Sequence, residues 1–252
     1  LAFVLALLLS PVWQDAAHAQ GTARSPVQPS APGDFMLGRP KGFLAVDGGF
    51  LFANAGSDLY DFVTEQLTLD KKAFNAPIVG LRLGALITPR LEVGVLVEQS
   101  RAPVTSEYRD FVDNNQLPIT QTTRLQEYQV AANLRWSLVP SGRRISRFAW
   151  IPRTVTPFVG AGAGAIKYRF EQYGSFVDFQ TFKVFNSSFR SEGWAPSAHA
   201  FVGADLRVYR RIYVTGEARY TWSSAPLGDD FVDFDPISLA GARVGGSLKL
   251  VF

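Results

Sequence analysis

The sequence predicts an all-β protein, an eight-stranded antiparallel up-and-down transmembrane β-barrel. Eight segments alternate apolar and polar side chains with a period of two, which is the period of a β-strand. Their connections are mostly long and short in turn, as in barrels that expose long loops on one side of a membrane and tight turns on the other. After the first segment no run of about 18 apolar residues occurs, so no membrane-spanning helix is expected there.

Composition narrows the class further. With 252 residues the chain fits one large domain or two small ones, and its 22 Gly and 15 Pro argue against a helical bundle. The absence of cysteine excludes disulfides, Cys-ligated zinc and a Cys nucleophile, and two histidines are too few for a His-cluster metal site. We therefore expect no metal and no cofactor. A net charge of +3 is too small to indicate a nucleic-acid partner.

The first 41 residues have the features of targeting and linking segments. Residues 1–19 are expected to be a signal peptide, because an apolar run from Leu1 to Leu9 precedes the small-residue cleavage pattern Ala17-His18-Ala19. The alternative is a buried N-terminal helix. Residues 20–41 contain four prolines among Ser, Gly and Gln, which predicts a Pro-rich periplasmic linker. Residues 42–252 then form the barrel.

Charged residues identify the polar face of each predicted strand in the first half of the barrel. The four segments are 42–53, 75–87, 91–98 and 124–136. Apolar side chains occupy the alternate positions in each, for example Val93, Val95 and Val97 in the third segment. The residues that mark the polar faces are, in order, Asp47, Arg82, Glu92, Glu98, Glu127 and Arg135.

The same alternation predicts four strands in the second half, at 154–170, 195–209, 212–222 and 240–252. The first of these is Gly-rich, so its two basic residues decide which face is polar. That choice places Phe158, Ile166, Tyr168 and Phe170 on its apolar face. The residues that mark the polar faces are Lys167, Arg169, His199, Asp205, Arg207, Glu217, Arg219, Arg243 and Lys249.

The connections predict the topology. Residues 88–90 and 209–211 form tight turns, whereas 55–74, 102–123, 171–193 and 224–236 are long loops. The segment 139–153 is a basic loop of medium length on the side of the tight turns. Long loops usually face the medium and short turns the periplasm, so both ends of the barrel are expected on the periplasmic side.

Two kinds of barrel fit this alternation. A soluble barrel would place its apolar face inside, around a ligand, whereas a membrane barrel places that face outward, against lipid. Charges of both signs along the polar faces favour the membrane barrel. Aromatic residues at the ends of the apolar faces also favour it, because such residues form belts at membrane–water interfaces; they are Phe50, Phe52, Tyr128, Trp136, Phe158, Tyr168, Tyr220 and Trp222.

Three short motifs carry a family resemblance. They are VGAGAG (159–164), VTGEARYTW (214–222) and the terminal GGSLKLVF (245–252). Together with the signal peptide and the strand count, they resemble the small outer-membrane β-barrel proteins of the OmpA, OmpX and OmpW type over roughly residues 40–252. The resemblance implies a location in the outer membrane, and it implies that Leu248, Leu250 and Phe252 are read by the barrel-assembly machinery. It carries over no catalytic residue, since the family is functionally mixed.

The interior of the predicted barrel is crowded with charge. Fourteen charged residues face inward if the polar faces line the lumen, namely the acids Asp47, Glu92, Glu98, Glu127, Asp205 and Glu217 and the bases Arg82, Arg135, Lys167, Arg169, Arg207, Arg219, Arg243 and Lys249. An eight-stranded barrel is just wide enough for side chains to fill. We therefore expect a structural network of ion pairs, with a narrow polar pore as the alternative.

One constellation could be catalytic. Ser197 and His199 share a strand face, and Glu217 lies on the next strand, so a nucleophile, a base and an orienting acid are present. Some outer-membrane lipid A deacylases use such residues on a barrel wall. The alternation, however, points His199 into the lumen and away from lipid. The preferred interpretation is a polar residue of the interior network.

An acidic cluster lies in the last long loop. Asp229, Asp230, Asp233 and Asp235 could offer oxygen ligands to calcium. Their spacing does not match an EF-hand loop, so a solvated acidic loop is the preferred interpretation.

The long loop 171–193 is rich in phenylalanine. It holds Phe176, Phe179, Phe182, Phe185 and Phe189, nearly one in every three residues. Solvated loops rarely expose so much aromatic surface. Either the loop packs on itself or on the barrel, or it contacts lipopolysaccharide, another protein or a host surface.

These observations predict a non-enzymatic integral outer-membrane protein whose extracellular loops serve envelope integrity or surface interaction. The alternatives are a narrow channel for small or hydrophobic solutes and, less favoured, a lipid-modifying enzyme. The expected partners are outer-membrane lipid, lipopolysaccharide and the barrel-assembly machinery, and the chain is expected to be a monomer.

Overall fold

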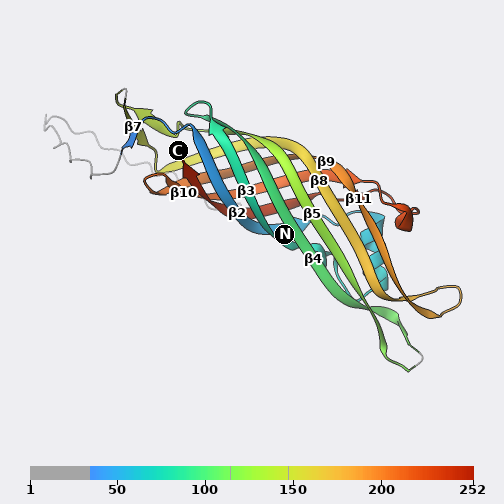
Figure 1. Cartoon of the computed structure of the whole chain (residues 1–252). Coiled ribbons are helices and arrows are strands. Elements are labelled where there is room, and N and C mark those ends of the chain that lie inside the picture. Colours follow the sequence, from blue (N-terminus) through green and yellow to red (C-terminus); the bar gives the residue numbers. More distant parts are fainter. Residues whose placement is uncertain (1–34, 114, 147) are drawn as a thin grey trace, which may run out of the picture. The chain divides into compact units, whose positions relative to one another are not determined.

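Eight antiparallel strands close into a ring in the computed structural model, which describes residues 35–113, 115–146 and 148–252 (Figure 1). The predicted signal peptide and most of the predicted linker lie outside these residues. Each strand pairs with its neighbours in sequence, and the last strand pairs with the first. The strands are β2 (Gly42–Ala53), β3 (Ala76–Leu86), β4 (Leu91–Val112), β5 (Pro118–Ser137), β8 (Val155–Val177), β9 (Val184–Tyr209), β10 (Ile212–Ala225) and β12 (Gly241–Val251). The predicted eight-stranded up-and-down barrel is confirmed.

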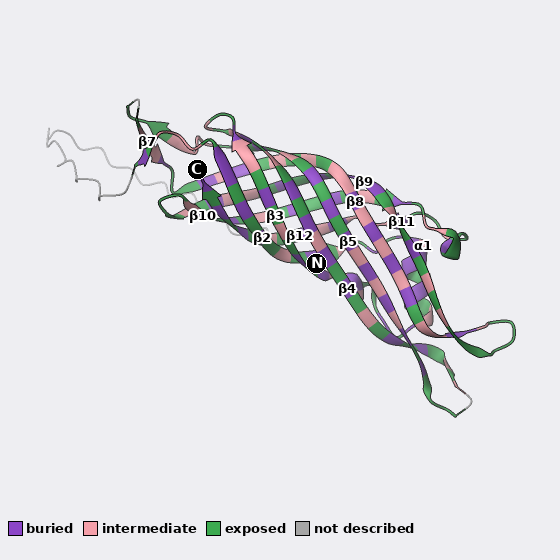
Figure 2. Cartoon of the chain, in the orientation of Figure 1, coloured by how far each residue is buried: buried purple, intermediate pink, exposed green. Residues whose placement is uncertain are grey.

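Buried and exposed residues alternate along the strands (Figure 2). Successive side chains of a strand point to opposite faces of the sheet, and here the outward set is apolar. It includes Leu44, Val46, Val79, Leu81, Leu83, Val95, Val97, Leu134, Val202, Val244 and Leu248, all exposed. An apolar outer face around a polar interior is the arrangement of a barrel that contacts lipid. In the described part of the chain no helix has the length and apolar character needed to cross a membrane.

Two of the four predicted long loops are mainly strand. Strands β4 and β5 remain paired as far as Glu107 and Thr120, and pair again at Val112 and Pro118 after a shift in register, whereas β8 and β9 are paired as far as Val177 and Val184. Both pairs therefore continue beyond the ring as long hairpins. Buried and exposed residues also alternate in these segments, but many of the buried ones are uncharged Thr, Ser and Gln, so no charge marks the inward face.

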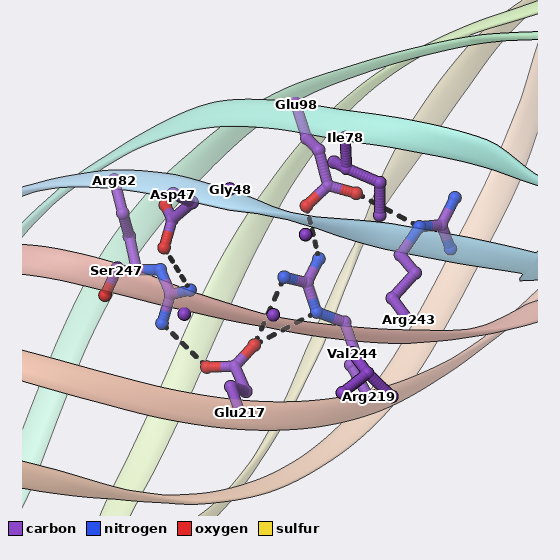
Figure 3. Close-up of a pocket in the computed structure, with 13 residues that line it drawn as sticks. Asp47, Gly48, Ile78, Arg82, Glu98, Glu217, Arg219, Arg243, Val244 and Ser247 are labelled. Atoms are coloured by element: carbon purple, nitrogen blue, oxygen red, sulfur yellow. Dashed lines mark hydrogen bonds and ion pairs between the residues drawn. The ribbon is translucent and has the colours of Figure 1, made fainter.

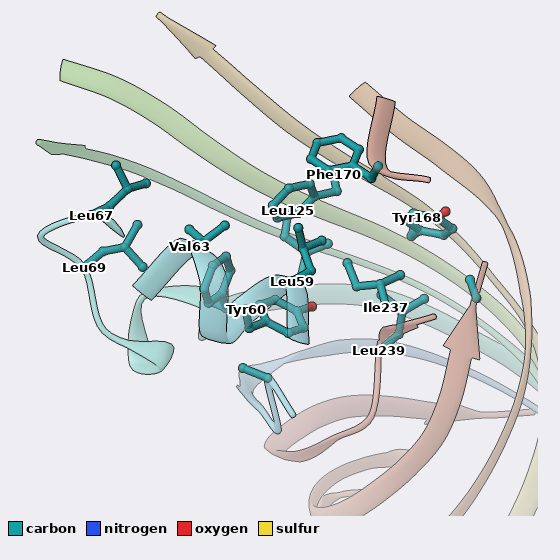
Figure 4. Close-up of a cluster of buried hydrophobic side chains, with 14 of the residues drawn as sticks. Leu59, Tyr60, Val63, Leu67, Leu69, Leu125, Tyr168, Phe170, Ile237 and Leu239 are labelled. Carbon is teal, nitrogen blue, oxygen red and sulfur yellow. The ribbon is translucent and has the colours of Figure 1, made fainter. Parts of the chain in front are cut away.

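The other two long loops fold across the mouth of the barrel. The loop after β2 contains helix α1 (Asp58–Gln66) and the short helix η1 (Lys71–Phe74). The loop after β10 contains η2 (Asp229–Phe231) and β11 (Ile237–Ser238). Apolar residues of these loops form one buried cluster with inward residues of β5 and β8 (Figure 4).

A small three-stranded sheet lies at the opposite end, among the short turns. Its strands are β1 (Met36–Leu37), β7 (Ala149–Pro152) and β6 (Gly142–Arg144), in that order. Met36 and Trp150 of this sheet share a buried apolar cluster with Phe43, Tyr213 and Val251 of the barrel. The last residues of the predicted linker are thus part of the fold, because Met36 has an apolar partner, and the medium loop 139–153 supplies two strands.

Candidate functional site

Ion pairs cross the barrel interior in its middle section (Figure 3). Arg82 of β3 donates to Asp47 Oδ1 and to Glu217 Oε2, each at 2.8 Å. Arg219 lies 3.1 Å from Glu217 Oε1 and also 3.1 Å from Glu98 Oε2 of β4. Strands β3 and β4 are not neighbours of β10 in the ring. The Arg82–Glu217 and Arg219–Glu98 contacts therefore cross the interior and connect separate walls of the barrel.

Arg243 of β12 extends the same network. Its guanidinium lies 3.0 Å from Glu98 Oε1 and donates to Glu127 Oε2 of β5 at 2.9 Å. The arginine and both glutamates are buried. Because each carboxylate contacts at least one arginine, the charges of this group compensate one another.

A second group of four charges lies nearer the short turns. Arg135 of β5 donates to Asp205 Oδ2 at 2.5 Å and lies 3.6 Å from Glu92 Oε2. Lys249 of β12 donates to Glu92 at 2.8 Å and lies 3.3 Å from Asp205. The guanidinium of Arg135 also lies over the Phe158 ring, 3.4 Å from its centre, where the aromatic face attracts a cation.

These two groups leave little free space. Beside the first group the cavity volume is about 30 Å³. Two cavities beside the second group measure about 20 and 10 Å³. Such volumes hold roughly one water molecule each. The described interior is therefore filled by side chains at both levels.

Eleven of the fourteen predicted lumen residues take part in these groups, namely Asp47, Arg82, Glu92, Glu98, Glu127, Arg135, Asp205, Glu217, Arg219, Arg243 and Lys249. Arg207 is half-buried at the end of β9, opposite Tyr213. The remaining two residues are outside the barrel.

The prediction is wrong for Lys167 and Arg169, whose strand β8 has the opposite orientation. Lys167 stands between Tyr128 and Trp194 in the register of the outer face. Arg169 Nε donates to Glu192 Oε2 at 3.0 Å, in a pair that is about 40% exposed, with side-chain values of 39% and 41%. Long basic side chains reach water from the edge of the membrane, so their charge did not mark an inward face.

The inward face of β8 consists of two parts, a row of glycines and a group of apolar side chains. Its glycines leave space for other side chains: a Cβ on Gly162 would lie 2.4 Å from His199 Nε2. Beyond these glycines, Ile166, Tyr168 and Phe170 pack against the loop cluster that contains α1. The predicted lipid-facing aromatics Phe158 and Tyr168 are thus buried inside. Trp194, which lies between the predicted loop 171–193 and the predicted strand 195–209, is an outward residue of β9 and is 61% exposed.

Helix α1 covers the interior at the loop end of the barrel. Leu59, Tyr60 and Val63 are fully or almost fully buried, and Tyr60 donates to the Ser238 carbonyl at 3.0 Å. Burial raises the pKa of the Tyr60 hydroxyl well above its ordinary value. An apolar cluster that contains α1 therefore fills the interior between the ion-pair network and the loop end.

The possible catalytic triad is not assembled. His199 Nε2 lies 2.7 Å from Asn133 Oδ1. Its strand partner on β10 is Thr221, whereas Glu217 is paired with Gly203. The Glu217 carboxylate is already bound by Arg82 and Arg219. His199 is inside the barrel, as its alternation predicted.

The four acidic residues of the last long loop are not gathered into one group. Asp230 Oδ2 accepts a hydrogen bond from the Arg190 amide, and the Asp235 amide donates to Asp58. Within the described residues, no three acidic or histidine side chains are grouped closely enough to hold a metal ion.

The phenylalanines of 171–193 surround a pocket at the loop end. Its volume is about 220 Å³, and its walls combine α1, η2 and the long β8–β9 hairpin. Four of the five predicted phenylalanines line it, namely Phe176, Phe179, Phe185 and Phe189. Phe182 is 68% exposed and contacts Phe111 instead. Phe62, Phe231 and Phe234 also line it, although no sequence motif had joined them to the hairpin.

The chain ends on the outer face of β12. Leu248, Leu250 and Phe252 are all exposed there. The Phe252 backbone exchanges hydrogen bonds with Gly42, each 2.9 Å long, at the closure between the first and last strands. The terminal side chain is thus available to lipid or to another protein.

We predict that Arg135→Ala destabilises the barrel by about 3–5 kcal/mol, because it leaves Asp205 buried without one of its partners. Urea unfolding in lipid vesicles, followed by tryptophan fluorescence, measures this free energy. An unchanged unfolding midpoint would contradict a supporting role for the network.

Leu134 provides the matched control, since it is the adjacent residue on the lipid face. Leu134→Ala should be mild. Leu134→Arg should cost roughly 2–4 kcal/mol if the position is near the bilayer midplane. The reverse order, with Ala severe and Arg tolerated, would place Leu134 in a packed core and exclude a lipid-facing barrel.

Comparisons with known proteins give distant structural likenesses only. No protein-family model and no curated protein matches the chain. Neisserial surface protein A aligns at 11% identity over 84% of this chain and 97% of its own, with a TM-score of 0.44. OprG from Pseudomonas aeruginosa aligns at 12% identity over 85% and 99%, with a TM-score of 0.45. Ail of Yersinia pestis aligns at 14% identity over 84% and 99%, with a TM-score of 0.38. The closed ring, apolar outer face and charged interior of this chain make it an integral outer-membrane β-barrel protein.

Proposed function

We propose that this chain is a non-enzymatic, non-conducting outer-membrane protein that acts through its extracellular loop layer. The observation that carries the proposal is the Phe-lined pocket of about 220 Å³, which opens at the loop end of a barrel filled elsewhere by its own side chains. Apolar pockets with a few polar groups are the usual form of ligand sites. The pocket would receive an apolar group of a molecule at the cell surface.

The charge of the loop layer limits the partner. The loop segments 54–75, 103–123, 175–189 and 224–240 contain twelve acidic and four basic residues. Gln66, Gln121, Gln172 and Asp230 are the polar and acidic residues that line the pocket. A neutral or cationic molecule with an apolar or aromatic portion fits this surface better than an anion.

The absence of enzymatic activity is part of the proposal. His199 contacts Asn133, and Glu217 is bound to two arginines. A base that contacts neither a nucleophile nor an orienting acid lacks the geometry of a hydrolase triad. Both residues are better explained as members of the interior packing.

We predict that Phe179→Ser weakens binding of N-phenylnaphthylamine, an apolar fluorophore, roughly tenfold, because it removes aromatic surface from the pocket. Fluorescence titration of refolded protein measures the affinity. Phe182→Ser is the matched control: it lies on the same hairpin tip and contacts Phe111 as Phe179 does, but it does not line the pocket. Equal losses in the two variants, or none in either, would reject the pocket as the binding site.

A narrow channel is the second candidate, and the same pocket favours it, since an apolar solute could enter there. The small interior cavities favour the closed barrel instead. We predict no steady conductance in planar bilayers, even after residues 57–67 are replaced by a Gly-Ser linker, because the ion pairs still fill the interior. Stable unit conductance of the unaltered protein would establish the channel.

The barrel-assembly machinery is the expected partner of the exposed C-terminal face. We predict that deletion of Phe252 lowers the fraction of heat-modifiable, folded protein in the outer membrane, because it removes one of the three outward residues Leu248, Leu250 and Phe252. Gel mobility with and without heating measures that fraction. Deletion of the exposed residue Val232 in a surface loop is the control, and equal yields in the two deletions would remove Phe252 from this role.

A further inference from the structure

A cationic groove lies at the end of the barrel opposite the loop pocket. Its volume is about 640 Å³, and it runs between the turn after β3 and the small sheet. Its charged lining consists of Arg39, Arg90 and Arg144, and two tryptophans, Trp136 and Trp150, complete its walls. No carboxylate lines it.

The three arginines have guanidinium N–H groups that make no hydrogen bond within the described structure. Arg39 is held in place because its Nη2 donates to the carbonyls of Leu86 at 3.1 Å and Ile87 at 3.0 Å. Arg90 and Arg144 are exposed. Among the described residues, no carboxylate lies within ion-pair distance of any of the three. Several guanidiniums that converge without a counter-charge favour an anion that accepts several hydrogen bonds.

The buried acidic residues nearest this end already form ion pairs inside the barrel. Glu92 and Asp205 are buried inside the barrel and bound to Arg135 and Lys249. The described chain segments that form the outside of this end contribute Lys41, Arg143, Arg153, Arg210 and Arg211 besides the groove arginines. The described part of this surface is therefore basic, in contrast to the acidic loop layer at the other end.

The groove also borders the lipid-facing surface. Trp136 is 46% exposed on the outer face of β5, two residues after the exposed Leu134 of the apolar belt. Trp150, by contrast, is buried and fixed, and a Cβ on Gly142 would lie 2.6 Å from its ring. Tryptophan marks the boundary between headgroups and acyl chains. A ligand here meets guanidiniums on one side and hydrocarbon on the other.

We propose that this groove binds the phosphate headgroup of an anionic phospholipid from the periplasmic leaflet, with its acyl chains along Trp136 and Leu134. The site goes beyond the proposed function, which concerns the opposite end of the barrel. A free phosphate would use the arginines but not the adjoining apolar surface. A phospholipid uses both, which is why we assign the groove to lipid. Basic clusters at a membrane surface attract anionic headgroups in this way.

The test is lipid retention by the refolded full chain in neutral detergent, measured by native mass spectrometry. Phosphatidylglycerol and phosphatidylcholine with identical acyl chains are supplied in equal amounts. Phosphatidylglycerol should be retained preferentially. The double variant Arg90→Gln, Arg144→Gln should lower its affinity about 25-fold, since each arginine near a surface contributes about fivefold. Neither side chain makes an ion pair in the described structure, and heat modifiability checks that the variant is folded.

The matched control is Arg210→Gln, Arg211→Gln. It removes the same charge from the same end but lies outside the groove, and it should retain the preference. An equal loss in both double variants would reduce the effect to diffuse electrostatics and overturn the site. Equal retention of the two lipids by the unaltered protein would do the same.

Two further measurements distinguish a phospholipid headgroup from a free phosphate ion. Trp136→Leu should weaken retention of phosphatidylglycerol, and millimolar inorganic phosphate should not displace the lipid. Full displacement by inorganic phosphate would make this a free-anion site and overturn the lipid assignment. Stronger binding of poly-glutamate than of phosphatidylglycerol would assign the groove to an acidic protein segment and would also overturn it.

Discussion

Charge pairing across a closed ring is the constraint on which the rest of the structure depends. Eight strands enclose a space only wide enough for side chains, so an inward charge must find its partner on another inward side chain. Arg82, Arg219 and Arg243 each contact two carboxylates, and most of these pairs join strands that are not neighbours. Buried pairs of this kind do not guarantee stability. They do make the arrangement of the eight strands specific, because a shift in register by one residue would turn every charge of that strand toward lipid.

The interior changes character toward the loop end. Above the ion pairs, Ile166, Tyr168 and Phe170 of β8 and Leu125 of β5 are apolar and inward. They would be unfavourable in a water-filled lumen, but α1 brings Leu59, Tyr60 and Val63 against them. The loop after β2 is thus a structural part of the barrel, and the Phe-lined pocket lies above a floor that is already filled.

The strand count, the order of the strands and most inward residues could be predicted from alternation alone, because the charges in β3, β4, β10 and β12 leave no choice of face. Strand β8 could not be predicted in this way. Its alternating Gly and Ala carry little information about faces, and its basic residues lie at the membrane edge, where a long side chain is tolerated outside. The long hairpins were missed because inward residues such as Ser106, Gln121 and Thr123 carry no charge that would mark a face. The pocket was missed because Phe62 and Phe234 reach it from loops remote in sequence.

The two ends of the barrel differ in charge, and this separates what each can bind. The interior network contains six carboxylates and five basic residues, so it is nearly neutral and adds little field to either end. The loop layer is acidic and surrounds an aromatic pocket, whereas the turn end is basic and borders a groove with three arginines. Fields at opposite ends of a barrel filled by side chains attract different molecules, because each field falls off with distance from its own end. The barrel therefore has two surfaces of opposite charge, an aromatic pocket within an acidic layer at one end and an arginine-lined groove within a basic surface at the other.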